Sequence, residues 1–103
     1  MRDLDKSTVL TLIAVSYRQD EIGQQVPIET RRKVYGNLSS ISASEWFEAG
    51  KTGLNAEHRI TMFSYDYDGE TIAELNGVRY GIYRTYLGRN ETIELYLERK
   101  AGV

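Results

Sequence analysis

Residues 71–86, TIAELNGVRYGIYRTY, contain the strongest local structural signal in the chain. Asn76 and Gly77 separate two segments of alternating apolar and polar side chains, and Asn-Gly is a preferred centre for a two-residue type I′ turn. We therefore expect a β-hairpin. Arg79 and Tyr83 fall on one face of its second strand. The apolar face of that strand is expected to hold Val78, Tyr80, Ile82 and Tyr86.

The segments on both sides of this hairpin also have the pattern of strands. Residues 58–65 and 92–98 alternate regularly, which is typical of half-buried strands. Residues 8–17 are apolar on both faces, which indicates burial on both sides or contact with another subunit. Residues 25–38 predict one long strand or two short ones. Pro27 has no N–H to donate, so its end of that strand should lie at a sheet edge or at the strand's start.

Turn signals separate these strands. Residues 66–70, DYDGE, have the composition of a turn and are too few for a calcium-binding loop. Gly36 lies inside an expected strand, where glycine often marks a bulge. The sequence therefore predicts a mainly β fold, a small barrel-like antiparallel domain of five to seven strands. Without an internal repeat or linker, the 103 residues are expected to form a single domain, residues 1–103.

Residues 41–57, ISASEWFEAGKTGLNAE, interrupt the series of strands and hold the one tryptophan. Ser42 and Glu45 have the spacing of a capping box, and Gly50 supplies a natural helix stop. These signals predict a helix of about two turns, which is marginally stable unless it packs on something. We therefore expect one short helix or a mobile loop around residues 42–57, and we expect this segment to carry function.

The composition narrows the classes of function. Thirteen basic and fifteen acidic side chains give a formal charge of −2, which argues against wrapping nucleic acid through overall charge. The absence of cysteine excludes disulfides and thiolate metal sites. Nothing resembles a signal peptide, and no segment approaches the roughly 20 apolar residues of a membrane helix. We expect a soluble protein made in the cytoplasm. Eight tyrosines fit strands and subunit interfaces.

Two groups of side chains are candidates for a site. Glu45, Glu48 and His58 would be the ligands of a metal-dependent enzyme, although capping explains Glu45 and a lone histidine makes no metal cluster. Arg79 and Arg84 are interleaved with Tyr83, an arrangement by which small barrels bind single-stranded nucleic acid, but core and subunit-interface positions are the favoured interpretation. No nucleophile–base pair or carboxylate pair stands out, so a binding or assembly role is favoured over an enzyme. No cofactor is expected.

Six motifs occur in a particular order along nearly the whole chain, from about Thr8 onward. They are GQQVP at 23–27, VYGN at 34–37, SASEWFEAG at 42–50, YDYDGE at 65–70, NGVRYGIYRT at 76–85 and ELYLE at 94–98. In this order and spacing the chain resembles the head-closure, or head-tail joining, proteins of long-tailed bacteriophages. It is most similar to the stopper proteins of phages and prophages of Gram-positive bacteria.

The resemblance implies a non-enzymatic virion assembly protein with a small barrel-like fold. Such a protein forms a ring, typically a dodecamer, at the head-tail connector of the virion, after being made in the host cytoplasm. Its partners would be other copies of itself, the adaptor ring protein on the portal, a tail completion or terminator protein, and the packaged double-stranded DNA that passes through the channel. The ring closes the portal channel after packaging and presents a docking platform for the tail.

In that family the segment between the second and third main strands can act as the channel gate. By position, the resemblance assigns the gate to Ser42, Glu45, Trp46, Phe47, Glu48, Gly50, Lys51, Gly53 and Asn55. Lys51 is the one cation among them; it would make a light phosphate contact or simply be solvated. The alternative function is a small β-barrel that binds single-stranded nucleic acid through Arg79, Tyr83 and Arg84.

Overall fold

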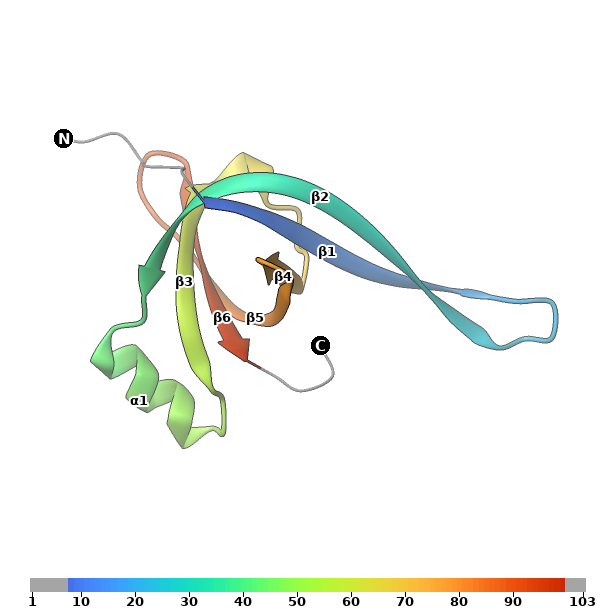
Figure 1. Ribbon diagram of the computed structural model, residues 1–103, viewed down its shortest axis with the longest axis horizontal. Coiled ribbons are helices and arrows are strands. Elements are labelled where there is room, and N and C mark those ends of the chain that lie inside the picture. The colour runs from blue at the N-terminus through green and yellow to red at the C-terminus, as the bar shows by residue number, and fades with distance from the viewer. Residues whose placement is uncertain (1–7, 100–103) are drawn as a thin grey trace.

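The computed structural model describes residues 8–99, so the ends of the expected single domain lie outside this range. Six antiparallel strands form one sheet that closes on itself as a barrel, in the order β1-β2-β3-β6-β5-β4 (Figure 1). This confirms the predicted mainly β fold with one short α-helix. The elements are β1 (Thr8–Gln19), β2 (Gln25–Ser40), α1 (Ala43–Lys51), β3 (Ala56–Phe63), the 3-10 turn η1 (Ser64–Asp66), β4 (Ile72–Leu75), β5 (Val78–Leu87) and β6 (Thr92–Arg99).

The predicted Asn-Gly hairpin is formed by β4 and β5. Asn76 and Gly77 have φ angles of 50° and 80°, the left-handed values that a type I′ turn requires. The alternation predicted for β5 holds only up to Ile82, because a β-bulge follows and one extra residue reverses the faces beyond it. Tyr80 is therefore buried as expected, whereas the prediction for Tyr86 is wrong: it is 57% exposed.

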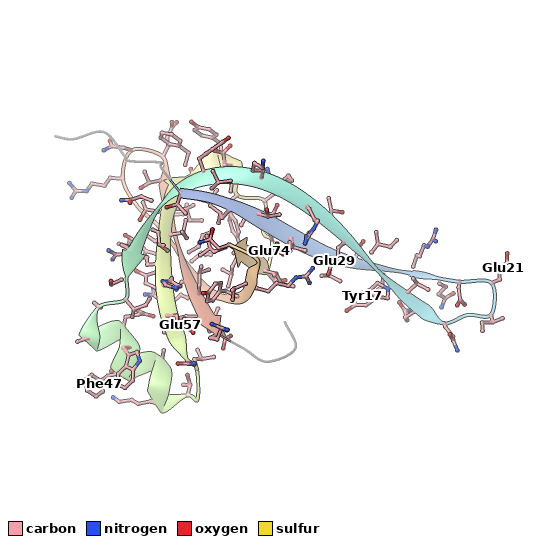
Figure 2. The ribbon with its side chains drawn as sticks, viewed as in Figure 1. Tyr17, Glu21, Glu29, Phe47, Glu57 and Glu74 are labelled. Atoms are coloured by element: carbon pink, nitrogen blue, oxygen red, sulfur yellow. The ribbon has the colours of Figure 1, made fainter. Side chains whose placement is uncertain are left out.

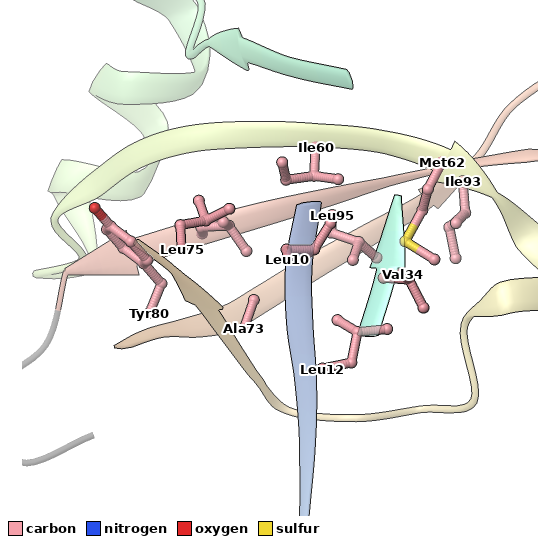
Figure 3. Close-up of a cluster of buried hydrophobic side chains, with 11 residues drawn as sticks. Leu10, Leu12, Val34, Ile60, Met62, Ala73, Leu75, Tyr80, Ile93 and Leu95 are labelled. Carbon is pink, nitrogen blue, oxygen red and sulfur yellow. The ribbon is translucent and has the colours of Figure 1, made fainter. Parts of the chain in front are cut away.

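The interior of the barrel is a single apolar cluster to which all six strands contribute (Figure 3). Leu12, Ile60 and Leu95 are completely buried, and full burial of one such side chain contributes about 1.5–3 kcal/mol. The cluster consists of Leu10, Leu12, Val34, Ile60, Met62, Ala73, Leu75, Tyr80, Ile93, Leu95 and Leu97. Each of these residues comes from a segment predicted to be a strand.

Gly36 serves close packing, and the bulge predicted for it is absent from the described pairing. The register between β1 and β2 runs without a shift from Gln25 to Gly36. A Cβ atom at position 36 would lie 2.7 Å from Cγ2 of Ile60 and 3.2 Å from the carbonyl oxygen of Thr61. Glycine is thus required because β2 crosses very close to β3 at this point.

The second apolar face of β1 is covered in part within the same chain, since Ile13 is buried while Val9 is 46% exposed. Ile13 lies on the outer face of the barrel, between Arg31 of β2 and Ile72 of β4 in the register, yet it is completely buried. Two ion pairs bridge over β1 at this level. Arg31 Nη2 lies 3.0 Å from Glu74 Oε1, and Arg79 of β5 binds both carboxylate oxygens of Glu29 on β2 at 2.8 and 2.9 Å.

An ion pair between the buried Glu70 and the half-exposed Arg32 closes the barrel where β1 and β2 leave it. Glu70 is 5% exposed and accepts hydrogen bonds from Arg32 Nε at 2.8 Å and from the backbone N–H of Asp68 at 2.9 Å. Burial alone would raise the pKa of Glu70, but these hydrogen bonds outweigh it and hold the pKa below its ordinary value. The Tyr67 hydroxyl donates to the Glu70 carbonyl, so Arg32, Tyr67 and Glu70 together form a polar layer at this end of the barrel.

Beyond this layer, β1 and β2 continue as a two-stranded arm, which we define as residues 14–30 (Figure 1). Here β1 has passed its pairing with β4, which ends at Ile13, and β2 pairs with β3 only from Asn37 onward. The arm gives the molecule extents of 56 × 31 × 23 Å and a radius of gyration of 15.1 Å, against about 13 Å for a compact chain of this length. Pro27 lies on the open edge, as predicted.

Candidate functional site

The predicted gate segment forms α1 and the turn that leads into β3. Ser42 is the N-cap: its hydroxyl accepts the backbone N–H of Glu45 at 3.2 Å, as the capping motif requires. In the predicted capping box the Glu45 carboxylate would in turn accept the backbone N–H of Ser42. Here the carboxylate turns toward β5 and binds Tyr83 and Arg84 instead. Local sequence therefore starts the helix, and a contact across the fold fixes the direction of Glu45.

The helix continues past the glycine that was expected to stop it, and the glycine that ends it lies three residues further on. Gly50 lies within α1, which runs to Lys51 with Thr52 as its C-cap. The Thr52 hydroxyl donates to the carbonyl of Ala49, and so does the backbone N–H of Leu54. Gly53 has a φ of +83° and is the residue that breaks the helix. Asn55 then ties the segment to β6, because its carbonyl accepts the backbone N–H of Arg99.

One polar cluster attaches α1 to the barrel. The Tyr83 hydroxyl donates to Glu45 Oε2 at 2.7 Å, and the guanidinium of Arg84 forms an ion pair with the same carboxylate. Tyr83 and Arg84 are neighbours, which would face opposite sides of a regular strand. The bulge between Ile82 and Arg84 turns both toward Glu45. Arg84 also lies 4.0 Å over the ring of Tyr96 on β6. We call these four residues the helix clamp.

The clamp perturbs the titration of its own members. Hydrogen bonding by Arg84, with a contribution from Tyr83, outweighs desolvation and lowers the pKa of Glu45 below its ordinary value. Burial raises the pKa of the Tyr83 hydroxyl, and the neighbouring Glu45 carboxylate raises it further. At neutral pH the clamp therefore holds an ionised Glu45 against a neutral tyrosine and a charged arginine.

Apolar attachment of α1 is slight. Ala49 is its one buried residue, while Trp46 and Phe47 are 53% and 62% exposed and contact each other edge to face at 5.3 Å between ring centroids. A cleft of about 470 Å³ lies between the helix and β5. It is lined by Glu45, Glu48, Ala49, Thr52, Leu54, Tyr83 and Arg84. This helix presents two aromatic side chains outward and is attached chiefly through polar contacts.

The three residues proposed as metal ligands have separate partners. Glu48 forms an exposed ion pair with Lys51, Glu45 belongs to the clamp, and His58 lies near Glu57 and against the ring of Tyr80. Across residues 8–99, no three histidine, cysteine, aspartate or glutamate side chains form a group that could hold a metal ion. The structure thus does not bring this predicted trio together.

The predicted nucleic-acid surface is divided in two by its ion pairs. Arg79 binds Glu29 and lies 3.6 Å from Glu74, at the root of the arm. Arg84 and Tyr83 belong to the helix clamp. The guanidinium groups of both arginines therefore already bind carboxylates, and contact with a phosphate backbone would have to displace these partners.

Sequence reasoning missed the clamp and the buried carboxylate at the barrel mouth. Tyr96 and Glu70 were read as a strand residue and a turn residue, and nothing in the local pattern distinguishes them. Scans against protein-family models and against curated proteins find no match to this chain. In the described range, no helix has both the length and the apolar character needed to cross a membrane.

Proposed function

We propose that this protein is a non-enzymatic head-closure, or stopper, protein of a long-tailed bacteriophage or prophage. In this proposal it forms a homo-oligomeric ring, a dodecamer in the virion, below the adaptor ring on the portal. The ring closes the channel after DNA packaging and gives the tail its docking platform. The proposal starts from the order and spacing of the six motifs, and the small closed barrel is compatible with it.

The observation that carries the proposal is the weak attachment of residues 42–57 between β2 and β3. This segment is the part of the chain that the resemblance assigns to the gate. One buried alanine and the helix clamp hold α1, and Gly53 provides a left-handed turn next to it. A gate must be able to move on assembly, and a helix held by a polar clamp is released more easily than one held by a buried apolar face.

The gate is tested by deleting residues 51–55 in the phage that encodes the protein. We expect rings to dock on filled capsids as before, while packaged DNA leaks out. Lys51→Ala is the matched control: it keeps the length of the segment and should retain DNA. Unchanged DNA retention in the deletion variant would show that this segment is not the gate.

The assembly role is tested separately by measuring the solution mass of the protein, alone and mixed with the adaptor–portal complex. Association in a ring stoichiometry supports the proposal. If the protein ignores a folded adaptor–portal complex, the head-closure function is wrong.

Single-stranded nucleic-acid binding remains the second candidate, because Tyr83 and Arg84 lie next to Tyr96 on the outside of a small barrel. This function predicts that an oligonucleotide binds at low salt and is released steeply as salt rises. A head-closure protein should show no such binding.

A further inference from the structure

The arm bears exposed apolar side chains that no other part of residues 8–99 covers. Tyr17 is 64% exposed, Ile28 is 38% exposed, and Ile22 at the tip is 78% exposed. A two-stranded ribbon is marginally stable in water by itself, so an arm of this kind gains order from a surface that covers it. The apolar side chains at its far end indicate where that surface would be.

The tip of the arm is a formed turn. The Asp20 carboxylate accepts the backbone N–H groups of Ile22 and Gln24 at 3.0 and 2.8 Å, and Gly23 supplies a φ of +85°. Ile22 is therefore presented by a shaped turn, next to the exposed carboxylate of Glu21. Among the described residues, no ion pair engages Glu21.

A second exposed turn lies at the other end of the long axis, where β5 passes into β6 (Figure 1). Leu87 is 70% exposed and Tyr86 is 57% exposed. Arg89 follows them, and no ion pair within residues 8–99 engages its guanidinium. Hydrogen bonds from the N–H of Gly88 to the carbonyl of Thr92, and back from Thr92 to Arg89, fix this turn.

The two turns are complementary in chemistry. One presents isoleucine beside an acidic side chain, and the other presents leucine and tyrosine beside a basic one. They lie at opposite ends of a 56 Å molecule, so they can meet only between two copies. We propose that the arm tip of one copy docks on the β5–β6 turn of the next, with Ile22 against Leu87 and Tyr86, and Glu21 against Arg89.

The helix α1 is the rival acceptor at the same end, and its charges argue against it. Figure 2 labels Phe47 on α1 and Glu21 at the arm tip, far apart along the long axis. Trp46 and Phe47 would cover Ile22, but Lys51, the cation of this helix, already pairs with Glu48. Glu21 would then lack a free partner, whereas Arg89 offers one.

This contact joins two different surfaces, so the copy that has used its arm still has a free acceptor, and its neighbour still has a free arm. Head-to-tail contacts of this type close into a ring when the rotation per copy allows it. The inference therefore specifies the subunit contact of the proposed ring and rests on that ring for its biological meaning. The contact itself can be tested without a phage.

Disulfide trapping is the direct test, because the chain has no cysteine of its own. Ile22→Cys and Leu87→Cys are introduced together, and the protein is oxidised over a range of concentrations. A disulfide needs Cα atoms about 5–6 Å apart, which these positions cannot reach within one copy. We expect a ladder of linked multimers from the double variant, and dimers alone when the two single variants are mixed.

Charge exchange supplies the second measurement. Glu21→Arg or Arg89→Glu should each slow the linking by about two- to fivefold, the range expected for an exposed ion pair. The two substitutions together should restore it. Glu91→Gln is the matched control, a change in the same turn that leaves Arg89 in place and should not weaken the contact.

The outcomes separate this contact from the proposed function. Linking of Ile22→Cys to itself would overturn the contact in favour of a two-fold dimer, and faster linking to Phe47→Cys would move the acceptor to α1. The absence of linking at any concentration also overturns the proposed contact. If wild-type protein nevertheless assembles with the adaptor–portal complex, the head-closure function is supported without this contact. A ladder from protein that never joins that complex upholds the contact and rejects head closure.

Discussion

The arm and α1 both project from the barrel, but they are attached by different means. The arm continues two strands of the sheet, and its root is held by Ile13, the bridging ion pairs above it and the Arg32–Glu70 pair. The helix has one buried alanine and the polar helix clamp. We therefore expect the root of the arm to share the stability of the barrel, and the helix to detach at a lower cost than global unfolding.

The largest effect expected from this difference is at the root of the arm. Ile13→Ala should lower the free energy of unfolding by about 3 kcal/mol, because it leaves a cavity under the ion pairs. Ile22→Ala is the control, since its exposed side chain should change stability by less than about 0.5 kcal/mol. Urea denaturation measures both. A small effect of Ile13→Ala would mean that the burial of Ile13 under the ion pairs contributes little to stability. The proposed difference between the arm root and the helix would then be wrong.

Next in size is the carboxylate that closes the barrel. Glu70→Gln should cost about 2 kcal/mol at pH 7, less than a fully buried pair because the Arg32 side chain is 40% exposed. The folded state lowers the pKa of Glu70, so its contribution is complete above the unfolded pKa of about 4.3. It is lost as the pH falls through the lower folded pKa.

The pH dependence separates this effect from general acid denaturation. The difference in free energy of unfolding between wild type and Glu70→Gln should disappear as the pH falls from about 4.3 through the lower folded pKa. The exposed Glu48→Gln serves as the control and should leave the curve of stability against pH nearly unchanged. Parallel curves for wild type and Glu70→Gln would contradict the assignment.

A smaller and local effect is expected at the helix. Glu45→Gln removes the charge that Arg84 and Tyr83 bind, so amide hydrogen exchange in α1 should accelerate by about two- to fivefold, while global stability falls by less than about 1 kcal/mol. Glu48→Gln lies on the same helix, outside the clamp, and should alter exchange far less. If α1 exchanges only through global unfolding, the helix is part of the cooperative core and the contrast with the arm disappears.

The smallest effect is expected from shortening the arm. Replacing residues 17–27 by Asn-Gly joins Ser16 to Ile28, which already face each other, through a two-residue turn. The barrel should then unfold within about 1 kcal/mol of wild type, because the deleted side chains bury little surface. Head-to-tail linking should be lost at the same time. A loss of several kcal/mol in thermal or urea melts would make the outer arm part of the core.

Regular strands were predictable because alternation records which face meets the core. Ile60, Met62, Ile93, Leu95 and Leu97 follow that rule and are buried as their pattern indicates. The Asn-Gly turn and the Ser42 cap were predictable for a similar reason, since each depends on the chemistry of a few adjacent residues.

What the sequence did not reveal depends on residues far apart in the chain. The bulge at Tyr83 shifts every later side chain of β5 to the other face, and no local signal marks it. Glu45 has the spacing of a capping residue, yet Arg84 competes successfully for its carboxylate. Gly36 was predicted to mark a bulge. The actual requirement for glycine comes from Ile60 on another strand, which the local sequence does not show.

The 16-residue strand β2 has a mechanical consequence. It runs from the arm turn to Ser40, two residues before the cap of α1, over a contour length of about 50 Å. No loop interrupts it, and it is fastened to the barrel through Arg32 on the inside and Gly36 against β3. The arm is thus connected to the first turn of the helix by one strand that contains no loop, and we expect a displacement of the arm tip to reach the start of α1 through β2.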